Sequence, residues 1–156
     1  MYLYLIQHAL SKSSDEDPER GLTDAGFAEI KKSSEFFRKL NPDISKIWHS
    51  GKKRAKQTAS VLAENLNLDS GAVVAEHSNL KPMDDVSLAA DELEKIENNI
   101  VIVGHLPHLS KLAAKLLTGQ VEGEVVRFKN AGIVCLYRDN NLWRLEWYIT
   151  PDILMS

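Results

Sequence analysis

The chain has 156 residues, of which 44% are hydrophobic and 26% charged, a composition typical of a globular protein that can bury a core. Its net charge of −3 argues against a general nucleic-acid-binding protein, which would be basic. Because no apolar stretch approaches the roughly 20 residues of a membrane span and no signal peptide is recognisable, we expect a single cytoplasmic domain over residues 1–156 that does not enter a membrane.

The first third of the chain predicts a strand, a loop and a helix. Residues 2–7 are mostly apolar or aromatic and are typical of a buried strand, which ends where His8 precedes a polar loop over residues 11–20. Thr23 is a suitable N-cap for the helix that follows. The Asn-Pro-Asp sequence of residues 41–43 ends this helix.

The middle of the chain repeats the alternation of strand and helix. Residues 44–48 predict a second strand, residues 49–51 a turn, and the chain from Lys52 a second helix with small and apolar residues on one side. A short third strand over residues 72–75 follows, and then an amphipathic helix over residues 86–96.

The last third begins with the clearest strand and then becomes rich in β-type residues. Residues 100–103 are Ile-Val-Ile-Val, which is typical of a strand buried on both faces, and residues 109–117 predict a helix. Further candidate strands cover residues 125–128, 133–137 and 143–149, with a hairpin turn at residues 139–141. The whole pattern predicts a three-layer α/β sandwich, with a mainly parallel central sheet and an antiparallel C-terminal edge.

Polar groups follow three of the predicted parallel strands. The first strand ends at His8, the second leads into a cationic helix start that contains Arg54, and the fourth ends at Gly104 and His105. Because the carboxyl ends of parallel strands meet at one edge of a sheet, we expect these groups to converge. Two imidazoles, a guanidinium and two helix N-termini predict a pocket for an anion, above all a phosphate.

Two histidines beside a phosphate indicate a division of labour. One is a nucleophile that takes the phosphoryl group covalently, and the other is a charged donor to the phosphoryl oxygens, helped by an arginine. Each residue also has an ordinary interpretation, Arg54 on a solvated helix face and His105 in a strand-end turn. A metal site of His8, His105 and His108 is a further alternative, but no carboxylate or cysteine lies close to these histidines in sequence.

Four blocks of sequence occur in a characteristic order: His8, residues 20–26 (Arg-Gly-Leu-Thr-Asp-Ala-Gly), Ser50 with residues 54–59 (Arg-Ala-Lys-Gln-Thr-Ala), and residues 101–107 (Val-Ile-Val-Gly-His-Leu-Pro). Together they resemble the histidine phosphatase superfamily, which has the phosphoglycerate mutase-like fold. The short chain and the Arg-x-Leu-Thr-x-x-Gly block resemble the SixA-type phosphohistidine phosphatases. The resemblance covers nearly the whole chain.

The resemblance implies roles for four residues. His8 would be the phosphorylated nucleophile, Arg54 would clamp the phosphoryl oxygens, and His105 would donate to the same oxygens. Arg20 would lie at or near the pocket. The resemblance implies no metal and no organic cofactor.

The chain departs from the family hallmark Arg-His-Gly, because it has Gln7-His8-Ala9. Gln7 can still donate a hydrogen bond to a phosphate oxygen, but the lost charge would cost about 1.5–3 kcal/mol, or one to two decades in binding or rate. Ala9 narrows the approach of the backbone to the phosphate. We expect His49, in the turn ahead of Arg54, to be exposed; the alternative is a donor at the rim of the pocket.

A general acid is not obvious. Larger members of the superfamily use a Glu or Asp after the third strand, where this chain has Asp84 and Asp85. The alternative is that this pair caps the helix that begins at Val86. SixA-type members also lack an obvious acid. The imidazole that leaves a phosphohistidine has a second nitrogen that takes a proton, so its P–N bond breaks with less help than an ester bond, which favours a phosphoramidate substrate.

The sequence therefore predicts an enzyme that removes phosphate from a histidine of a phosphotransfer signalling protein, through a phosphohistidine intermediate on His8. Cationic residues 52–56 would steer this phosphorylated partner. One alternative is a broad phosphatase for small phosphate monoesters, with Asp84 or Asp85 as acid. Another is a degenerate, non-catalytic phosphate-binding module, which Gln7 and Ala9 favour.

Overall fold

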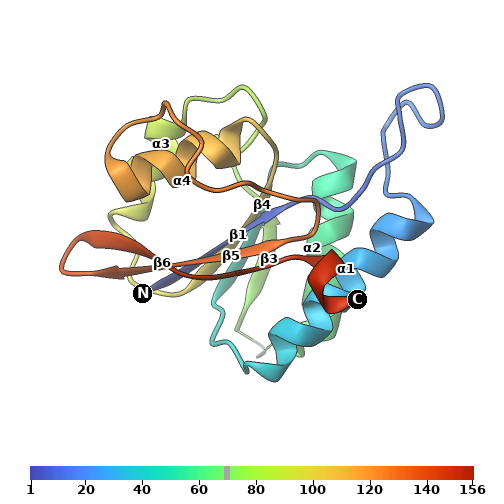
Figure 1. The fold of residues 1–156 in the computed structure, drawn as a ribbon, viewed down its shortest axis with the longest axis horizontal. Helices are drawn as coiled ribbons and strands as arrows, with labels where there is room; N and C mark the ends of the chain where they lie inside the picture. The colour runs from blue at the N-terminus through green and yellow to red at the C-terminus, as the bar shows by residue number, and fades with distance from the viewer. Residues whose placement is uncertain (69–70) are drawn as a thin grey trace.

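The computed structural model describes residues 1–68 and 71–156. In it, six strands form one mixed sheet in the order β3-β2-β4-β1-β5-β6 (Figure 1). The strands are β1 (Tyr2–Gln7), β2 (Lys46–His49), β3 (Val73–Glu76), β4 (Ile100–Gly104), β5 (Ile133–Asp139) and β6 (Leu142–Ile149). Strands β1 to β4 pair in parallel, whereas β5 pairs antiparallel with both β1 and β6. This confirms the predicted parallel sheet with an antiparallel C-terminal edge.

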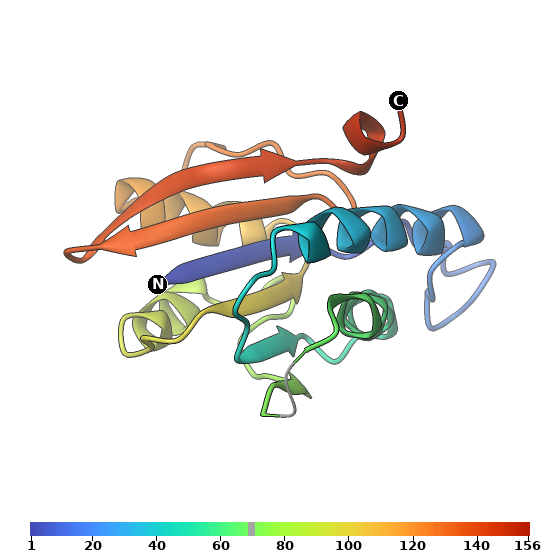
Figure 2. The ribbon, with the colours of Figure 1, turned by 90° about the horizontal axis from the view of Figure 1, so that it is seen from below.

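Helices cover both faces of the sheet, which confirms the three-layer architecture (Figure 2). Helices α1 (Asp24–Lys39) and α2 (Lys53–Leu66) pack on one face, and α3 (Val86–Leu93) and α4 (His108–Thr118) pack on the other. A short helix, α5 (Pro151–Leu154), follows β6 and lies beside α1. In the part of the chain that the structure describes, no helix is both long and apolar enough to cross a membrane.

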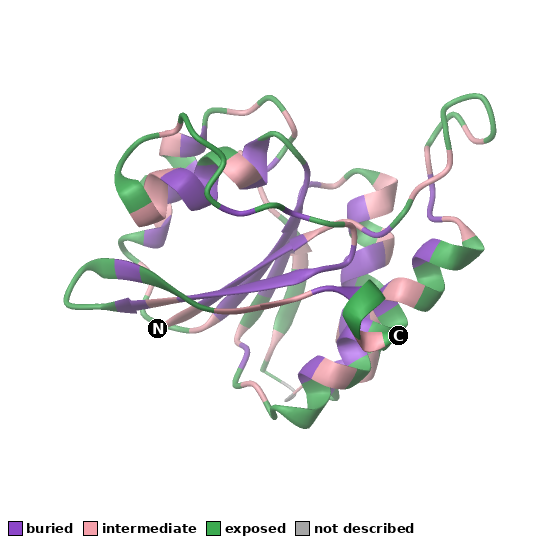
Figure 3. Ribbon diagram, in the orientation of Figure 1, coloured by how far each residue is buried: buried purple, intermediate pink, exposed green. Residues whose placement is uncertain are grey.

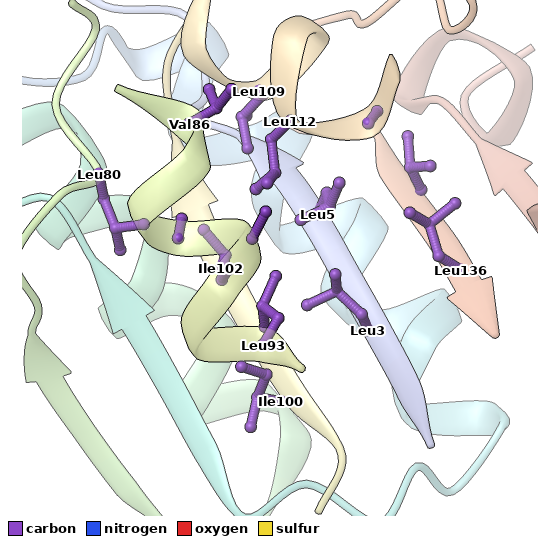
Figure 4. Packing of buried hydrophobic residues seen from close by; sticks show 14 of the residues in the cluster. Leu3, Leu5, Leu80, Val86, Leu93, Ile100, Ile102, Leu109, Leu112 and Leu136 are labelled. Atoms are coloured by element: carbon purple, nitrogen blue, oxygen red, sulfur yellow. The ribbon is translucent and has the colours of Figure 1, made fainter. Parts of the chain in front are cut away.

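The two central strands are buried on both faces (Figure 3). In β1, Leu3 and Leu5 point towards α3 and α4 (Figure 4). Tyr4 and Ile6 pack on the side of α1 and α2. Strand β4 alternates in the same way. Burying each such aliphatic side chain contributes about 1.5–3 kcal/mol. The core therefore fixes β1 and β4 at the centre of the sheet, and the residues that follow them at the centre of its carboxyl edge.

The C-terminal part differs from the prediction in one segment. The hairpin turn predicted at residues 139–141 is formed by Asn140 and Asn141, which have φ values of 50° and 63°, whereas Asp139 is the last residue of β5. Residues 125–128, however, are not a strand but part of an irregular connection between α4 and β5. Val126 and Phe128 are buried in the core, which gives the segment the alternation of a strand. Within residues 1–68 and 71–156 this segment pairs with no strand, and β5, the next strand in the chain, is already paired with β1 and β6.

Candidate active site

The register of β1 against β4 brings the two predicted histidines together. Gln7 pairs with Gly104, and the backbone N–H of His8 donates to Gly104 O at 3.0 Å. His8 and His105 each follow directly, and their ring centroids lie 5.2 Å apart with 51° between the planes. Two residues separated by almost a hundred positions therefore share one site at the carboxyl edge of the sheet.

The position of the proton on His8 follows from a single contact. The Nδ1 atom lies 2.7 Å from the carbonyl oxygen of Ala9. A carbonyl only accepts, so Nδ1 carries the hydrogen and Nε2 keeps the lone pair. The nitrogen that can attack phosphorus is therefore Nε2.

Ser50 determines the proton position on His105. Both side chains are only 1% exposed, and Ser50 Oγ lies 2.6 Å from His105 Nε2. The same Oγ accepts a hydrogen bond from the backbone N–H of Lys52 at 3.3 Å. The Ser50 hydroxyl therefore donates to Nε2, since within residues 1–68 and 71–156 no other acceptor is bonded to it. The hydrogen of His105 is then on Nδ1, a buried atom to which none of the described protein groups is bonded.

Ser50→Ala is expected to lower the rate of phosphoryl transfer about 10-fold, because the proton of His105 is no longer held on Nδ1. Nitrogen-15 NMR of the His105 ring should show a single tautomer in the wild type and a mixture in the variant. A loss of activity with an unchanged tautomer would mean that Ser50 acts in another way.

Both histidines are neutral at neutral pH. Burial lowers the pKa of His8 to about 4; the hydrogen bond to Ala9 opposes this shift, and the charges of Arg54 and Arg20 add to it. Burial and the nearby charges of Arg54 and His8 lower the pKa of His105 to about 3. A neutral His8 is the form that can act as a nucleophile. For His105 the structure differs from the expected charged donor, because burial keeps the imidazole ring neutral.

These lowered pKa values predict a loss of stability in acid. Histidine in an unfolded chain has a pKa of about 6.5. As the pH falls from about 6.5 towards 4, the unfolded chain binds protons that the folded protein does not, so the free energy of unfolding decreases. The stability that the two neutral histidines contribute is fully present above pH 6.5. Chemical denaturation at pH 7 and pH 5 should show a smaller loss for His105→Asn than for the wild type. An equal loss would contradict this assignment.

Helix α2 positions both Arg54 and the backbone behind His8. Thr58 Oγ1 donates to the carbonyl of Arg54 at 2.7 Å and accepts the N–H of Ala9 at 3.0 Å. One turn of the helix thus holds Arg54 and the residue after His8 together. The Nε of Arg54 is buried, and no described protein acceptor is bonded to it.

The loop after His8 returns Arg20 to the site. A bridge between Ser11 and Leu22 closes the base of this loop, and the N–H of Leu22 donates to Gln57 Oε1 of α2 at 2.8 Å. The guanidinium of Arg20 donates to Lys12 O and Ser11 Oγ, both at 3.3 Å. Arg20 lines the same cavity as Arg54, and its charge contributes to lowering the pKa of His8 and of Arg54. Its role in binding a phosphoryl group stays a prediction.

A cavity of about 770 Å³ opens between this loop and the start of α2. It is lined by Pro18, Glu19, Arg20, Gly51, Lys52, Lys53, Arg54 and Lys56. Lys53 is paired with Asp17 at 3.4 Å and with Glu19 at 3.5 Å, whereas Lys52 and Lys56 are exposed. Cations at a helix N-terminus are unfavourable for the helix itself, and α2 has no acidic residue in its first turn. This cluster of positive charge suits an anionic substrate.

The two residues beside His8 differ in position. Ala9 is fully buried, its N–H is bonded to Thr58 and its carbonyl to the ring of His8, so its backbone holds the His8 side chain in place. Gln7 lines a different cavity, and its Oε1 atom is buried. A contact of either residue with substrate stays a prediction.

The expectation that His49 is exposed is wrong. Strand β2 extends to His49, which pairs with Val103 of β4 and Glu76 of β3. Its side chain is only 6% exposed, and its Nδ1 accepts the N–H of Gly51 at 3.1 Å. His49 is therefore buried at the carboxyl end of β2, inside the sheet, rather than exposed on the surface.

Asp84 and Asp85 stabilise the loop that leads into α3. Asp85 is the N-cap of α3 and accepts the N–H of Ser87 at 2.9 Å, which confirms its capping interpretation. Asp84 accepts the N–H of Lys81 at 2.9 Å. A role as general acid stays a prediction for both.

Four further residues connect the site and were not assigned roles from the sequence: Ser50, Gln57, Thr58 and Asn130. Asn130 Nδ2 donates to the carbonyl of His8 at 2.9 Å. The first three lie within the sequence blocks that also contain Arg54, which was the available signal. His108 is buried at the start of α4, and the described residues contain no group of three or more His, Cys, Asp or Glu side chains arranged to hold a metal ion.

The chain is similar to known phosphatases in sequence and in structure. The family model of the histidine phosphatase superfamily (branch 1) matches residues 3–84. Phosphohistidine phosphatase SixA of Escherichia coli (strain K12) is 29% identical over 127 residues, which are 77% of this chain and 76% of that protein.

Two solved structures extend the likeness to the whole fold. The structure of the protein histidine phosphatase SixA complexed with tungstate has a TM-score of 0.84 and 25% identity, and covers 99% of both chains. The alpha-ribazole phosphatase from Shigella flexneri has a TM-score of 0.76 at 16% identity, with 97% of each chain covered, which is a likeness of fold alone.

Proposed function

The chain belongs to the histidine phosphatase superfamily, and on this basis we propose that it is a SixA-like phosphohistidine phosphatase. The observation that carries the proposal is the pairing of His8 with His105. The Nε2 of His8 has a free lone pair, the neighbouring imidazole presents an Nδ1–H, and Arg54 lies in the first turn of the adjacent helix α2. A nucleophile and two donors for phosphoryl oxygens are the groups that phosphoryl transfer to a protein side chain requires.

The proposed reaction has two steps. His8 Nε2 attacks the phosphorus of the substrate's phosphohistidine, a P–N bond to His8 forms, and the P–N bond to the substrate imidazole breaks. The departing ring takes up a proton from solvent. Water then attacks the phosphorus, the bond to His8 breaks, and phosphate leaves with free His8. In both steps Arg54 and the Nδ1–H of His105 stabilise the negative oxygens of the phosphoryl group.

The proposed substrate is a histidine-phosphorylated phosphotransfer protein of a signalling system in the cytoplasm. The curated relative from E. coli carries the name of a phosphohistidine phosphatase, which supports this class. The cationic cavity beside the site supports an acidic partner, because opposite charges accelerate association.

The proposal is tested by comparing three substrates: a histidine-phosphorylated phosphotransfer domain, phosphoramidate and an aryl phosphate ester. We expect kcat/KM to be highest for the protein and lowest for the ester. Only the value for the protein should fall steeply with salt, because it alone depends on long-range steering. Faster turnover of the ester would contradict the proposed substrate class.

Replacing Asp84 and Asp85 together by asparagine should leave phosphoramidate cleavage within about twofold of the wild type. Asparagine caps a helix as well as aspartate does, so α3 remains capped. Steady-state phosphate release is the measurement. A loss of phosphoramidate cleavage in a folded variant would show that one of these carboxyls acts as the general acid.

A further inference from the structure

The connection between α4 and β5 is bonded directly to the segment that carries the nucleophile. Asn130 Nδ2 donates to the carbonyl of His8 and the N–H of Ala131 donates to the carbonyl of Gln7, both at 2.9 Å. Figure 1 shows this connection returning from α4 to the end of β1 before β5 begins. Asn130 and Ala131 are therefore held against the backbone of Gln7 and His8.

Gln7 and this connection line a common cavity of about 510 Å³. Its walls include Gln7, Glu29, Arg127, Lys129, Asn130 and Asp152. The Oε1 atom of Gln7 is buried, and none of the donors in the described residues is bonded to it. A buried amide oxygen without a donor is costly, so a donor that can reach this cavity is favoured there.

Of the two cations that line this cavity, Arg127 is the one without a carboxylate partner among the described residues. Lys129 is paired with Asp152 at 3.2 Å. Arg127 is exposed, and within residues 1–68 and 71–156 no carboxylate lies within 4.0 Å of its guanidinium. Its backbone is held, because Tyr148 OH donates to its carbonyl at 2.7 Å.

The charges around His8 are asymmetric. Arg54 and Arg20, whose charges act on His8, both line the cationic cavity, whereas Gln7, the residue before His8, lines a separate cavity and carries no charge. In that second cavity Lys129 is paired with Asp152, which leaves the guanidinium of Arg127 to balance a phosphoryl charge. A guanidinium presents several donors, so one arginine can bind a phosphoryl oxygen and the Gln7 oxygen together.

We propose that Arg127 is a substrate-binding residue that contacts the phosphoryl oxygens from the Gln7 side. Gln7 Oε1 accepts one of its N–H groups and positions it, so Arg127 supplies the positive charge that Gln7 lacks. This inference rests on the proposed phosphatase site but concerns binding of the phosphoryl group, which can be measured without turnover.

The test measures the dissociation constant of inorganic phosphate by calorimetry and the kcat/KM for phosphoramidate. Arg127→Gln should weaken phosphate binding about 10- to 100-fold, the loss of one charge-assisted contact, and lower kcat/KM by a similar factor. Lys129→Gln is the matched control from the same cavity and should change both values less than about threefold. Gln7→Arg should restore binding in the Arg127→Gln background and add little to the wild type, because it replaces the same charge.

The outcomes separate this inference from the proposed function. Unchanged phosphate binding in Arg127→Gln, with only the protein substrate affected, would mean that Arg127 contacts the partner and would overturn the inference. Phosphate binding that depends on Arg127, without phosphoramidate cleavage by the wild type, would support the inference and overturn the phosphatase. A wild type that binds no phosphate would overturn both.

Discussion

His8→Asn is expected to lower phosphate release from phosphoramidate by about 10⁴-fold or more. The variant lacks the imidazole Nε2 that forms the proposed bond to phosphorus. Among the described residues of the site, no other nitrogen with a free lone pair occupies the same position. Asparagine can still donate to Ala9 O, so the loop behind it is retained. The measurement is phosphate release under saturating substrate.

His77→Asn is a matched control for this experiment. His77 lies outside the site, where its Nε2 bonds to Glu92 Oε2 at 2.8 Å and its ring stacks on Trp48. We expect it to retain activity. If His8→Asn kept more than a small fraction of the wild-type rate while folded, His8 would not be the nucleophile.

Arg54→Gln is expected to lower kcat/KM for phosphoramidate about 10²–10³-fold, which corresponds to about 2.7–4 kcal/mol of transition-state stabilisation. The guanidinium is part of the first turn of α2, and its buried Nε has no described protein acceptor, so its donors are available to the phosphoryl oxygens. The amide removes both the charge and the fork of donors.

Two further variants separate charge from geometry. Arg54→Lys keeps the charge without the fork and should recover only part of the activity. Lys56→Gln, an exposed cation two residues along the same helix, should leave phosphoramidate cleavage nearly unchanged. Equal effects of Arg54→Gln and Lys56→Gln would mean that Arg54 acts only through the general positive potential.

The central strands could be predicted from the sequence because burial alone determines them. Strand β1 begins and ends at the predicted residues, and β4 differs by one residue. Continuous apolar runs of this length are typical of strands in the middle of a parallel sheet, where both faces are buried. The convergence of His8 with His105 then followed from strand direction.

Elements that depend on a neighbour were harder to predict. Residues 125–128 have the alternation of a strand, but pairing needs a free sheet edge, and the edges of this sheet are β3 and β6. His49 was assigned to a turn because its pairing with Val103 and Glu76 depends on strands distant in the chain. Helix α5, of four residues, is too short to produce a periodic pattern.

The chemical state of the site could not be predicted either. The neutral form of His105 depends on its burial and on Arg54 and His8, and its tautomer depends on Ser50. The environment of Gln7 depends on a connection more than a hundred residues away, which brings Arg127 into the same cavity. Sequence identified which groups meet, whereas proton positions and charge balance required their spatial arrangement.

The proposed covalent intermediate is tested most directly by detecting a phosphoryl group on His8 during turnover. Wild-type protein is mixed with phosphoramidate, quenched in alkali within one turnover, digested and examined by mass spectrometry. We expect the peptide that contains His8 to gain the mass of one phosphoryl group, and the corresponding peptide of His8→Asn to gain none. Phosphate release without a phosphorylated intermediate, or a phosphoryl group on any other residue, would contradict it.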